Sequence, residues 1–348
     1  MSVEKVLLAS PRGFCAGVEM AIKALAWMVR VFEPPVYCYH EIVHNQVVVE
    51  RFEQLGVVFV EDVAAVPEGA PLMLSAHGSP PEVVARARAS GGVVVNAVCP
   101  LVKKVHHEVK VRAGKGYTIV YVGHAGHQEA IGTMAVAPDA IHLVESPEDI
   151  DAIPEPGGPV AFLAQTTLAL DEWRALLDHA EQRWPELWVP GHSDLCFATT
   201  NRQAALKAIA GRSDVVVVIG SANSSNTRAL ERTAVAAGCG LVLRVNGPDE
   251  LPEELTGTVG VIAGASAPEA LVEAVVERLS PAQGCEEVMA VDEDEYFQSP
   301  PELRDLLRNA AAVVGLAALA PEGAPVGAGV LFDDRSIDAA EALSALPS

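Results

Sequence analysis

The sequence has no closely spaced cysteine pair, no long apolar run and few basic residues. Its 24 lysines and arginines stand against 46 acidic residues, which gives a formal net charge of −22. This balance argues against a nucleic acid or an anionic membrane as partner, because such surfaces attract clustered lysine and arginine. No stretch approaches the roughly 18 apolar residues that span a bilayer, and the opening residues do not resemble a signal peptide. We therefore expect a cytoplasmic protein that does not bind membranes.

Size and composition are those of a globular protein. In the cytoplasm, the six cysteines are expected to be thiols or metal ligands rather than disulfides. A length of 348 residues suggests two or three domains, at roughly 100–200 residues each. Apolar residues make up 50% of the chain and charged residues 20%, which excludes a disordered chain.

Short apolar, β-branched runs alternate with longer segments of helical periodicity. This alternation predicts an α/β fold with small, mostly parallel sheets, in which sites form just past the carboxyl ends of strands. The predicted strands are Val6–Ala9, Val36–Tyr39, Val57–Val60, Leu72–Ser75, Val93–Asn96, Thr118–Val122, Ile141–Val144, Val160–Leu163, Val215–Ile219, Leu241–Val245 and Val259–Ile262. The clearest predicted helices are Val18–Phe32, Leu101–Val111, Thr200–Ala210 and Thr227–Ala237.

A pattern of cysteines and polar strand ends occurs three times. Each of three cysteines precedes a helical segment, and two polar strand ends follow it at similar spacings. Cys15, Cys99 and Cys196 are followed after 29, 28 and 28 residues by His44, His127 and Ser224, and after 62, 67 and 70 residues by His77, Thr166 and Ser266. Consecutive blocks with one pattern indicate three copies of one βαβ-rich unit.

The repeat predicts three similar α/β domains, which comprise residues 1–98, 99–195 and 196–284. Residues 285–348 form a C-terminal segment. Within it, residues 303–319 and 336–346 are expected to be helical, and residues 318–329, rich in alanine, glycine and proline, a flexible stretch.

The three repeated cysteines are candidate metal ligands. Thiolates are the soft ligands that select iron–sulfur clusters, zinc and copper(I). The gaps of 84 and 97 residues between these cysteines match neither a structural zinc site nor a common ferredoxin spacing. Spacing alone leaves the metal open, although three such ligands suit a cubane cluster with one iron free of protein thiolate. The alternative, a small buried hydrophobe, is what we expect of Cys38, Cys239 and Cys285.

Nine ordered motifs resemble those of a known enzyme family. They are PRGFCAGVEMAI, YHEIVHN, SAHG, CPLVKKVH, GHAGHQE, QTTL, CFATTNRQ, GSANSSNT and AGASAP, in a resemblance that extends over residues 5 to 304. The family is the 4-hydroxy-3-methylbut-2-enyl diphosphate reductases of the methylerythritol phosphate isoprenoid pathway.

The resemblance implies a pseudo-threefold trefoil of three α/β domains around a central 4Fe–4S iron–sulfur cluster. Cys15, Cys99 and Cys196 would be its ligands and would leave one iron open to substrate. The implied reaction reduces (E)-4-hydroxy-3-methylbut-2-enyl diphosphate by two electrons, with loss of water, to isopentenyl and dimethylallyl diphosphates, the last step of that pathway. Members of the family take electrons from a ferredoxin or flavodoxin-type donor.

Histidines and one helix start are the candidate diphosphate contacts. A neighbouring anion favours the imidazolium, which donates two hydrogen bonds, and the N–H groups at a helix start form an anion site. Residue type and the resemblance together predict diphosphate contacts at His44, His77, His127, Ser224, Ser225, Asn226 and Ser266. The alternative for the serine and asparagine residues is ordinary helix capping.

Glu129 and Thr166 are the predicted catalytic residues. The resemblance makes Glu129 the proton donor to the leaving hydroxyl and to the allylic intermediate, and a carboxyl group beside a diphosphate is expected to have a raised pKa. Thr166 would orient the substrate alcohol and relay protons. The alternative for Glu129 is a solvated carboxylate at a helix start.

Two other classes of protein remain open. A non-redox hydro-lyase also uses a three-cysteine cluster with an open iron, and a sensor or scaffold would hold a cluster without catalysis. A hydro-lyase is expected to bind a carboxylate substrate through arginine. The motifs contain only Arg12 and Arg202, whereas their histidines and serines suit a phosphate.

Overall fold

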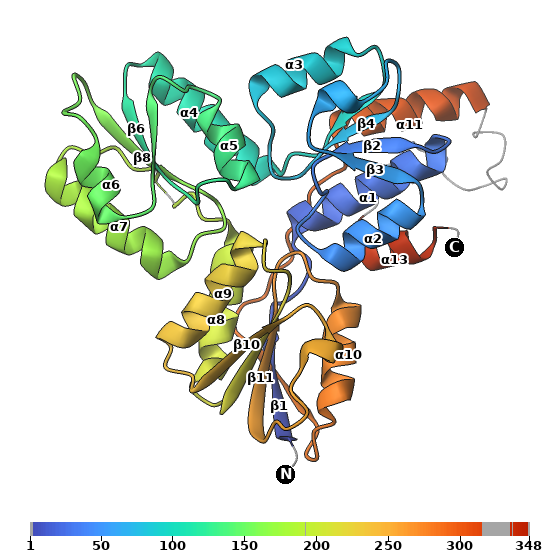
Figure 1. Cartoon of the computed structure of the whole chain (residues 1–348), viewed down its shortest axis with the longest axis vertical. Helices are drawn as coiled ribbons and strands as arrows, with labels where there is room; N and C mark the ends of the chain where they lie inside the picture. Colours follow the sequence, from blue (N-terminus) through green and yellow to red (C-terminus); the bar gives the residue numbers. More distant parts are fainter. Residues whose placement is uncertain (1–2, 192, 315–334, 336, 347–348) are drawn as a thin grey trace. The chain divides into compact units, whose positions relative to one another are not determined.

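The computed structural model describes residues 3–191, 193–314, 335 and 337–346. Across these residues the chain forms three sheets, and every pair of neighbouring strands in them is parallel (Figure 1). The predicted α/β fold with small parallel sheets is therefore confirmed. None of the helices in these ranges is both long enough and apolar enough to cross a membrane.

The first sheet has the strand order β3-β2-β4-β5. Its strands are β2 (Val36–Tyr39), β3 (Val57–Val60), β4 (Leu72–Leu74) and β5 (Val94–Asn96). The helical segments of this part are α1 (Ala16–Val31), α2 (Gln46–Gln54), the 3-10 turn η1 (Val63–Ala65) and α3 (Pro81–Ala89).

The second sheet has the order β7-β6-β8. Its strands are β6 (Thr118–Val122), β7 (Ile141–Val144) and β8 (Val160–Ala164). The helices of this part are α4 (Pro100–Gly114), α5 (Gln128–Met134), α6 (Pro147–Ala152) and α7 (Leu170–Arg183). Beyond β8, Trp188 forms an isolated parallel bridge with Ala161.

The third sheet has the order β10-β9-β11-β1-β12. Its strands are β1 (Val3–Ser10), β9 (Val215–Ile219), β10 (Leu241–Val245), β11 (Gly257–Ala263) and β12 (Cys285–Met289). The helical segments of this part are α8 (Phe197–Ala210), α9 (Ser225–Ala236), η2 (Pro248–Glu250) and α10 (Glu269–Leu279). Every residue of β9, VVVVI, is buried, as expected for a parallel strand covered on both faces.

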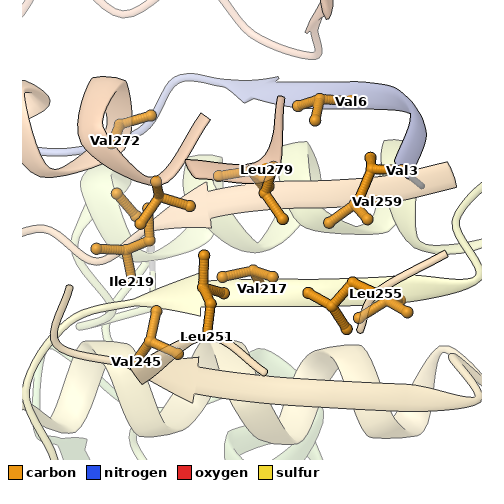
Figure 2. Packing of buried hydrophobic residues seen from close by; sticks show 14 of the residues in the cluster. Val3, Val6, Val217, Ile219, Val245, Leu251, Leu255, Val259, Val272 and Leu279 are labelled. Carbon is orange, nitrogen blue, oxygen red and sulfur yellow. The ribbon is translucent and has the colours of Figure 1, made fainter. Parts of the chain in front are cut away.

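The strand nearest the N-terminus lies inside the third sheet. β1, in blue, pairs with β11 and with β12 (Figure 1). Figure 2 shows Val3 and Val6 of β1 in the same apolar cluster as Val259 of β11 and Val217 of β9. Burial of these side chains stabilises the pairing of two strands, β1 and β11, that are more than 200 residues apart in the sequence.

The three sheets share one order of strands. The third sheet is circularly permuted, because β1, from the start of the chain, takes the place of the last strand. In each, a central first strand (β2, β6 or β9) is flanked by its successor and by a third strand (β4, β8 or β11). A closing segment then pairs with the third strand, and a repeated cysteine follows it. The closing segments are β5 before Cys99, Trp188 before Cys196, and β1 before Cys15.

The C-terminal segment contributes helices α11 (Pro301–Val314) and α13 (Ala339–Ser344). Helix α13 packs on α1, where the Ala339 N–H donates to Glu19 Oε2 at 2.7 Å and Lys23 Nζ donates to the Ile337 carbonyl at 3.0 Å. Within the described residues, the helices predicted at 303–319 and 336–346 are thus found over Pro301–Val314 and Ala339–Ser344. The flexible stretch predicted at residues 318–329 lies outside the described residues.

The described residues divide into two compact units. One comprises Met1–Cys15, His44–Gln46 and Leu101–Asp294, and holds the second and third sheets. The other comprises Ala16–Val43, Val47–Pro100 and Glu295–Ser348, and holds the first sheet with α11 and α13. The predicted domain boundaries at residues 99, 196 and 285 stay a prediction.

Candidate functional site

The three repeated cysteines occupy equivalent positions at helix starts. Cys15 directly precedes α1, Cys99 directly precedes α4, and Cys196 is the N-cap residue of α8. Each cysteine therefore lies at the positive end of a helix dipole, which attracts negative charge.

The same backbone hydrogen bond fixes all three cysteines. In each case the cysteine N–H donates to the carbonyl of the second residue after the third strand of a sheet. The bonds are Cys15 to Ala265 at 3.2 Å, Cys99 to Ala76 at 3.0 Å and Cys196 to Thr166 at 3.0 Å. Each cysteine is thus bonded to the backbone at one of the second polar strand ends. Cys15 bonds next to Ser266, Cys99 next to His77, and Cys196 at Thr166 itself.

Cys196 lies close enough to Cys15 for their charges to interact. Burial, with a smaller contribution from negative charge on Cys15, raises the pKa of the Cys196 thiol to about 12, and hydrogen bonds with Thr199 oppose the shift. Cys196 Sγ lies 3.0 Å from Thr199 Oγ1 and 3.3 Å from the Thr199 N–H. Two neighbouring thiols that repel each other when ionised are stabilised as thiolates by a bound cation. This donor set fits a metal cluster.

The described residues include no group of three His, Cys, Asp or Glu side chains able to hold one metal ion. A cubane cluster does not require such a group, because each cysteine binds a separate iron. Of the other cysteines, Cys38 is fully buried, as predicted. The expectation that Cys285 is a buried hydrophobe is wrong, because it begins the edge strand β12 and is exposed. Cys239 is intermediate, and its Sγ donates to the Leu241 carbonyl.

Glu129 is a buried carboxyl group held by Thr166. Its side chain is 3% exposed, so the alternative of a solvated carboxylate does not hold. Oε1 accepts from the Thr166 N–H at 2.7 Å, and Oε2 accepts from Thr166 Oγ1 at 3.0 Å. Burial raises the pKa of Glu129 to about 7, while the two bonds from Thr166 lower it. A carboxyl group with this pKa exchanges a proton at neutral pH.

A second buried carboxyl group, Asp194, influences Glu129. Its Oδ2 accepts from the Ala164 N–H at 3.1 Å, and its Oδ1 has no hydrogen-bond partner within the described part of the chain. Burial raises the pKa of Asp194 to about 7, and its charge in turn raises the pKa of Glu129. Sequence reasoning missed Asp194, although it lies two residues before Cys196.

His127 lies beside both Glu129 and His44. It is the N-cap residue of α5, and its Nδ1 accepts from the Glu129 N–H at 3.2 Å. The rings of His127 and His44 meet edge to face, with centroids 5.4 Å apart. Burial lowers the pKa of His127 to about 3, and the charge of His44 lowers it further. In the ligand-free chain His127 is therefore neutral, with its proton on Nε2, rather than an imidazolium that donates from both nitrogens.

The predicted serine and asparagine residues form a buried loop at the start of α9. Ser224 caps this helix by accepting from the Thr227 N–H at 3.3 Å, so the capping alternative holds for Ser224. Asn226 Oδ1 accepts from the Ala265 N–H at 2.9 Å, and Asn226 Nδ2 lies 3.4 Å from Thr199 Oγ1. Asn226 thus connects Ala265, which bonds to Cys15, to Thr199, which bonds to Cys196.

Ser266 and Gln165 join this loop to neighbouring predicted residues. Ser266 Oγ donates to the His44 carbonyl at 2.9 Å, and Ser266 does not cap α10, whose N-cap residue is Pro268. Gln165 Nε2 donates to Ser225 Oγ at 3.0 Å, and Gln165 Oε1 accepts from the His124 N–H at 2.9 Å. The signal for Gln165 was available, since it directly precedes Thr166.

Arg202 is another residue that sequence reasoning did not place in the site. It is 1% exposed, and its Nε and Nη2 donate to the Gly13 carbonyl at 3.0 and 2.8 Å. Nη2 also donates to the Phe14 carbonyl at 3.1 Å, and Nη1 donates to Glu293 Oε1 at 2.9 Å. Arg202 therefore ties α8, which follows Cys196, to the two residues that precede Cys15.

The structure brings together most of the predicted site residues within one unit. That unit holds Cys15, His44, His127, Glu129, Thr166, Cys196, Ser224, Ser225, Asn226 and Ser266. Cys99 and His77 lie in the other unit, where His77 Nδ1 is 3.4 Å from Ser75 Oγ. The roles predicted for all these residues stay predictions.

Comparisons with known proteins agree on one family. The family described as LytB protein matches residues 6–280. A relative from Rhodopirellula baltica, named 4-hydroxy-3-methylbut-2-enyl diphosphate reductase, is 44% identical over 318 residues, which are 90% of this chain and 99% of the relative. A relative from Mycobacterium bovis, named 4-hydroxy-3-methylbut-2-enyl diphosphate reductase 2, is 49% identical over 282 residues, which are 79% of this chain and 85% of the relative.

Solved structures agree with these relatives. The E-1-hydroxy-2-methyl-but-2-enyl-4-diphosphate reductase from Plasmodium falciparum aligns with a TM-score of 0.86 and 30% identity, covering 88% of this chain and 99% of that one. A structure of (E)-4-hydroxy-3-methyl-but-2-enyl diphosphate reductase, titled the terminal enzyme of the non-mevalonate pathway, aligns with a TM-score of 0.58 and 32% identity. It covers 80% of this chain and 99% of that one.

Proposed function

The chain belongs to the LytB protein family, and we propose that it reduces (E)-4-hydroxy-3-methylbut-2-enyl diphosphate to isopentenyl and dimethylallyl diphosphates. The reaction consumes two electrons and two protons, breaks the C–O bond of the alcohol, releases the oxygen as water and forms one C–H bond. Identity of 44% to a relative with the matching name, over 99% of that relative, supports this activity.

We propose that Cys15, Cys99 and Cys196 hold a 4Fe–4S cluster. The proposal rests on their equivalent helix-start positions and on the shared backbone hydrogen bond. Cys99 is included on its place in the repeat and on the family resemblance. When bound, such a cluster supplies the electrons and an iron without a protein thiolate, which acts as a Lewis acid.

The proton for the leaving hydroxyl is assigned to Glu129. The single observation that carries this assignment is the pair of hydrogen bonds from Thr166 to a carboxyl group that is 3% exposed. The Thr166 N–H can only donate, so Oε1 stays an acceptor and we assign the proton of neutral Glu129 to Oε2. In that form Oε2–H donates to Thr166 Oγ1, 3.0 Å away, and the Thr166 hydroxyl is free to donate its own proton to the substrate alcohol.

The diphosphate is assigned to the histidines and to the loop at the start of α9. His127 offers its Nε2 proton, and the buried N-terminus of α9 offers the hydroxyl groups of Ser224 and Ser225 with backbone N–H groups. His44, Asn226 and Ser266 are held next to these groups by the contacts described above. His77 is included on the family resemblance.

The hydro-lyase alternative is disfavoured by the contacts of the two motif arginines. Arg202 is committed to the Gly13 and Phe14 carbonyls and to Glu293. Arg12 is paired with Glu269 and with Glu287. Both guanidinium groups are therefore occupied by the protein itself and are poor candidates to bind a substrate carboxylate.

The electron donor is proposed to be a ferredoxin or flavodoxin-type protein, and the location is proposed to be the cytoplasm. Within the described residues no two cysteines form a disulfide, which supports a reducing compartment.

The experiment that tests the function is an anaerobic assay of reconstituted protein with reduced methyl viologen. Wild type is expected to convert the allylic alcohol diphosphate to both products with two electrons consumed per turnover, and to form none without the reductant. Glu129→Gln should lower kcat by about 10²–10³-fold with unchanged iron content, because it removes a general acid. Glu148→Gln, at an exposed position of α6, is the matched control. Turnover without reductant, or a Glu129→Gln rate near that of wild type, would contradict the proposal.

A further inference from the structure

Lysines are concentrated in one segment of this acidic chain. Four of its seven lysines lie between residues 103 and 115, whereas the net charge of the chain is −22. Helix α4 contains Lys103, Lys104 and Lys110, and Lys115 directly follows its last residue. The segment 100–115 also contains Arg112, and its only acidic residue is Glu108.

The lysines of this segment differ from the other three in their pairing. Elsewhere Lys5, Lys23 and Lys207 each pair with a carboxylate, at 2.5, 3.8 and 3.1 Å respectively. Lys103, Lys104, Lys110 and Lys115 are exposed, and none of them forms a direct ion pair within the described ranges of the chain. The one ion pair of the helix joins Arg112 to Glu108. We call these four lysines the α4 basic face.

The packing of α4 orients most of these charges to solvent. Val102, Val105 and Val109 are buried, and the last two belong to the apolar core of the second sheet. Lys103, His107 and Lys110 follow at the spacing of one helical face and are exposed. The helix therefore presents a row of cations on a rigid element whose other side is anchored in the core.

The α4 basic face lies next to one of the proposed cluster ligands. Helix α4 begins at the residue after Cys99, so Lys103 and Lys104 are within its first turns. A partner seated on this face is thus brought to the segment that carries Cys99.

We propose that the α4 basic face is the docking surface for an acidic protein that carries one electron at a time. This inference rests on the proposed reductase activity and adds the place where electrons enter. Two molecules of reduced carrier bind in turn, and each gives up one electron and leaves oxidised. The two electrons, with two protons, convert the substrate alcohol to water and the allylic carbon to a C–H bond. Charge complementarity accelerates the encounter with such a carrier and fixes its orientation.

The overall charge of the chain argues for a small acidic protein over a nucleic acid. A long polyanion would extend beyond four lysines over a chain whose net charge is −22, and would be repelled there. A compact carrier needs complementarity only across its own contact patch.

The test compares two double charge reversals with equal change in net charge. Lys103→Glu/Lys110→Glu alters the α4 basic face at two exposed positions. Lys207→Glu/Arg278→Glu alters exposed residues of α8 and α10 and serves as the control. Each protein is assayed with reduced methyl viologen and with a reduced plant-type [2Fe–2S] ferredoxin, and ferredoxin binding is measured by calorimetry at low ionic strength.

The expected result is a rise of about tenfold or more in the KM for ferredoxin, and in its Kd, in the Lys103→Glu/Lys110→Glu protein. Its rate with methyl viologen should stay within about twofold of wild type, and the control should behave as wild type in every assay. Added salt should raise the KM of wild type more steeply than that of the variant. Equal loss of ferredoxin binding in both double variants, or unchanged ferredoxin binding in Lys103→Glu/Lys110→Glu, would overturn the proposal. So would a wild type that binds a DNA duplex and not ferredoxin, with the duplex binding lost in Lys103→Glu/Lys110→Glu. A wild type inactive with methyl viologen would refute the reductase activity, and the calorimetry would still decide the docking surface.

Discussion

Thr166 connects the carboxyl group of Glu129 to the backbone of Cys196. It donates to Glu129 from its N–H at 2.7 Å and from Oγ1 at 3.0 Å, and its carbonyl accepts from the Cys196 N–H at 3.0 Å. A proposed acid and a proposed cluster ligand are therefore held by one residue, through bonds that do not depend on substrate.

The pH dependence of turnover should report the ionisation of Glu129. Its pKa is raised from an ordinary 4.5 to about 7 by burial, so the folded protein keeps the proton to higher pH than an exposed glutamate does. If Oε2 delivers that proton, kcat should be constant below about pH 6 and fall roughly tenfold per pH unit well above pH 7. Assays with reduced methyl viologen between pH 5.5 and 9 check this, and a flat profile to pH 8.5 would remove Glu129 as the acid.

The same shift has a defined effect on stability. Because the folded-state pKa lies above the unfolded value of 4.5, the stabilising contribution of protonated Glu129 is fully present below about pH 4.5 and is lost as pH rises through about 7. Asp194, with its pKa also raised to about 7, acts in the same direction. Urea unfolding of Glu129→Gln should show a shallower loss of stability between pH 5 and 8 than wild type, and parallel curves would contradict the buried carboxyl group.

Replacing Thr166 should displace the pH profile. The bond from Thr166 Oγ1 lowers the pKa of Glu129, so Thr166→Val should move the midpoint of the kcat profile upward by about one pH unit. Thr166→Ser keeps the hydroxyl group and should restore the wild-type midpoint. A Thr166→Val protein whose midpoint is unmoved would show that this bond does not tune Glu129.

Removing the buried guanidinium of Arg202 should weaken cluster retention. Arg202→Gln removes the cation paired with Glu293, which keeps only the bond from Asn201, and the guanidinium donors of the Gly13 and Phe14 carbonyls. This loss should cost about 3–5 kcal/mol in the free energy of unfolding. Iron retained per chain should fall, because these carbonyls directly precede Cys15. Arg212→Gln, which removes a partly exposed pair with Glu286, should cost about 1 kcal/mol or less. Full iron retention in Arg202→Gln would show that Arg202 does not hold the loop before Cys15 in place for the cluster.

Gly264 should tolerate no side chain, because Thr227 occupies the space beside it. A Cβ on Gly264 would lie 2.3 Å from Thr227 Oγ1, so Gly264→Ala must displace the start of α9 with its serine loop. We expect a loss of about 1–3 kcal/mol in stability and a raised KM for the diphosphate substrate. Gly211→Ala has no atom within 4 Å of the added carbon and is the control; equal KM values in both variants would contradict the expected displacement.

Serine substitutions should divide five of the six cysteines into two classes. Cys15→Ser, Cys99→Ser and Cys196→Ser should each lose most of the iron and the visible absorption of the reconstituted protein, since thiolates hold such clusters. Cys239→Ser and Cys285→Ser should retain both. An iron-replete Cys99→Ser protein would exclude Cys99 as a ligand and with it the threefold arrangement.

Local pattern was sufficient for most of the fold. The valine-rich runs at Val57–Val60 and Val215–Ile219 are found at their predicted bounds, because apolar, β-branched residues favour buried strands whatever their partners. Strand β12 was missed, since CEEVM contains two glutamates and alternates between half-buried and exposed positions at a sheet edge. The pairing of β1 with β11 was also missed, because no local signal specifies a partner so distant in the sequence.

The sequence by itself determined the α/β class, the threefold cysteine pattern and the family, because residue type, periodicity and spacing are written along the chain. Only the tertiary structure decided that Glu129 is buried with a pKa of about 7, and that Arg202 reaches the residues before Cys15. Desolvation and hydrogen bonding depend on atoms from distant parts of the chain. Thr166 is 37 residues from Glu129, and Arg202 is 189 residues from Gly13. Residues so far apart in the sequence come into contact only when the sheets have formed.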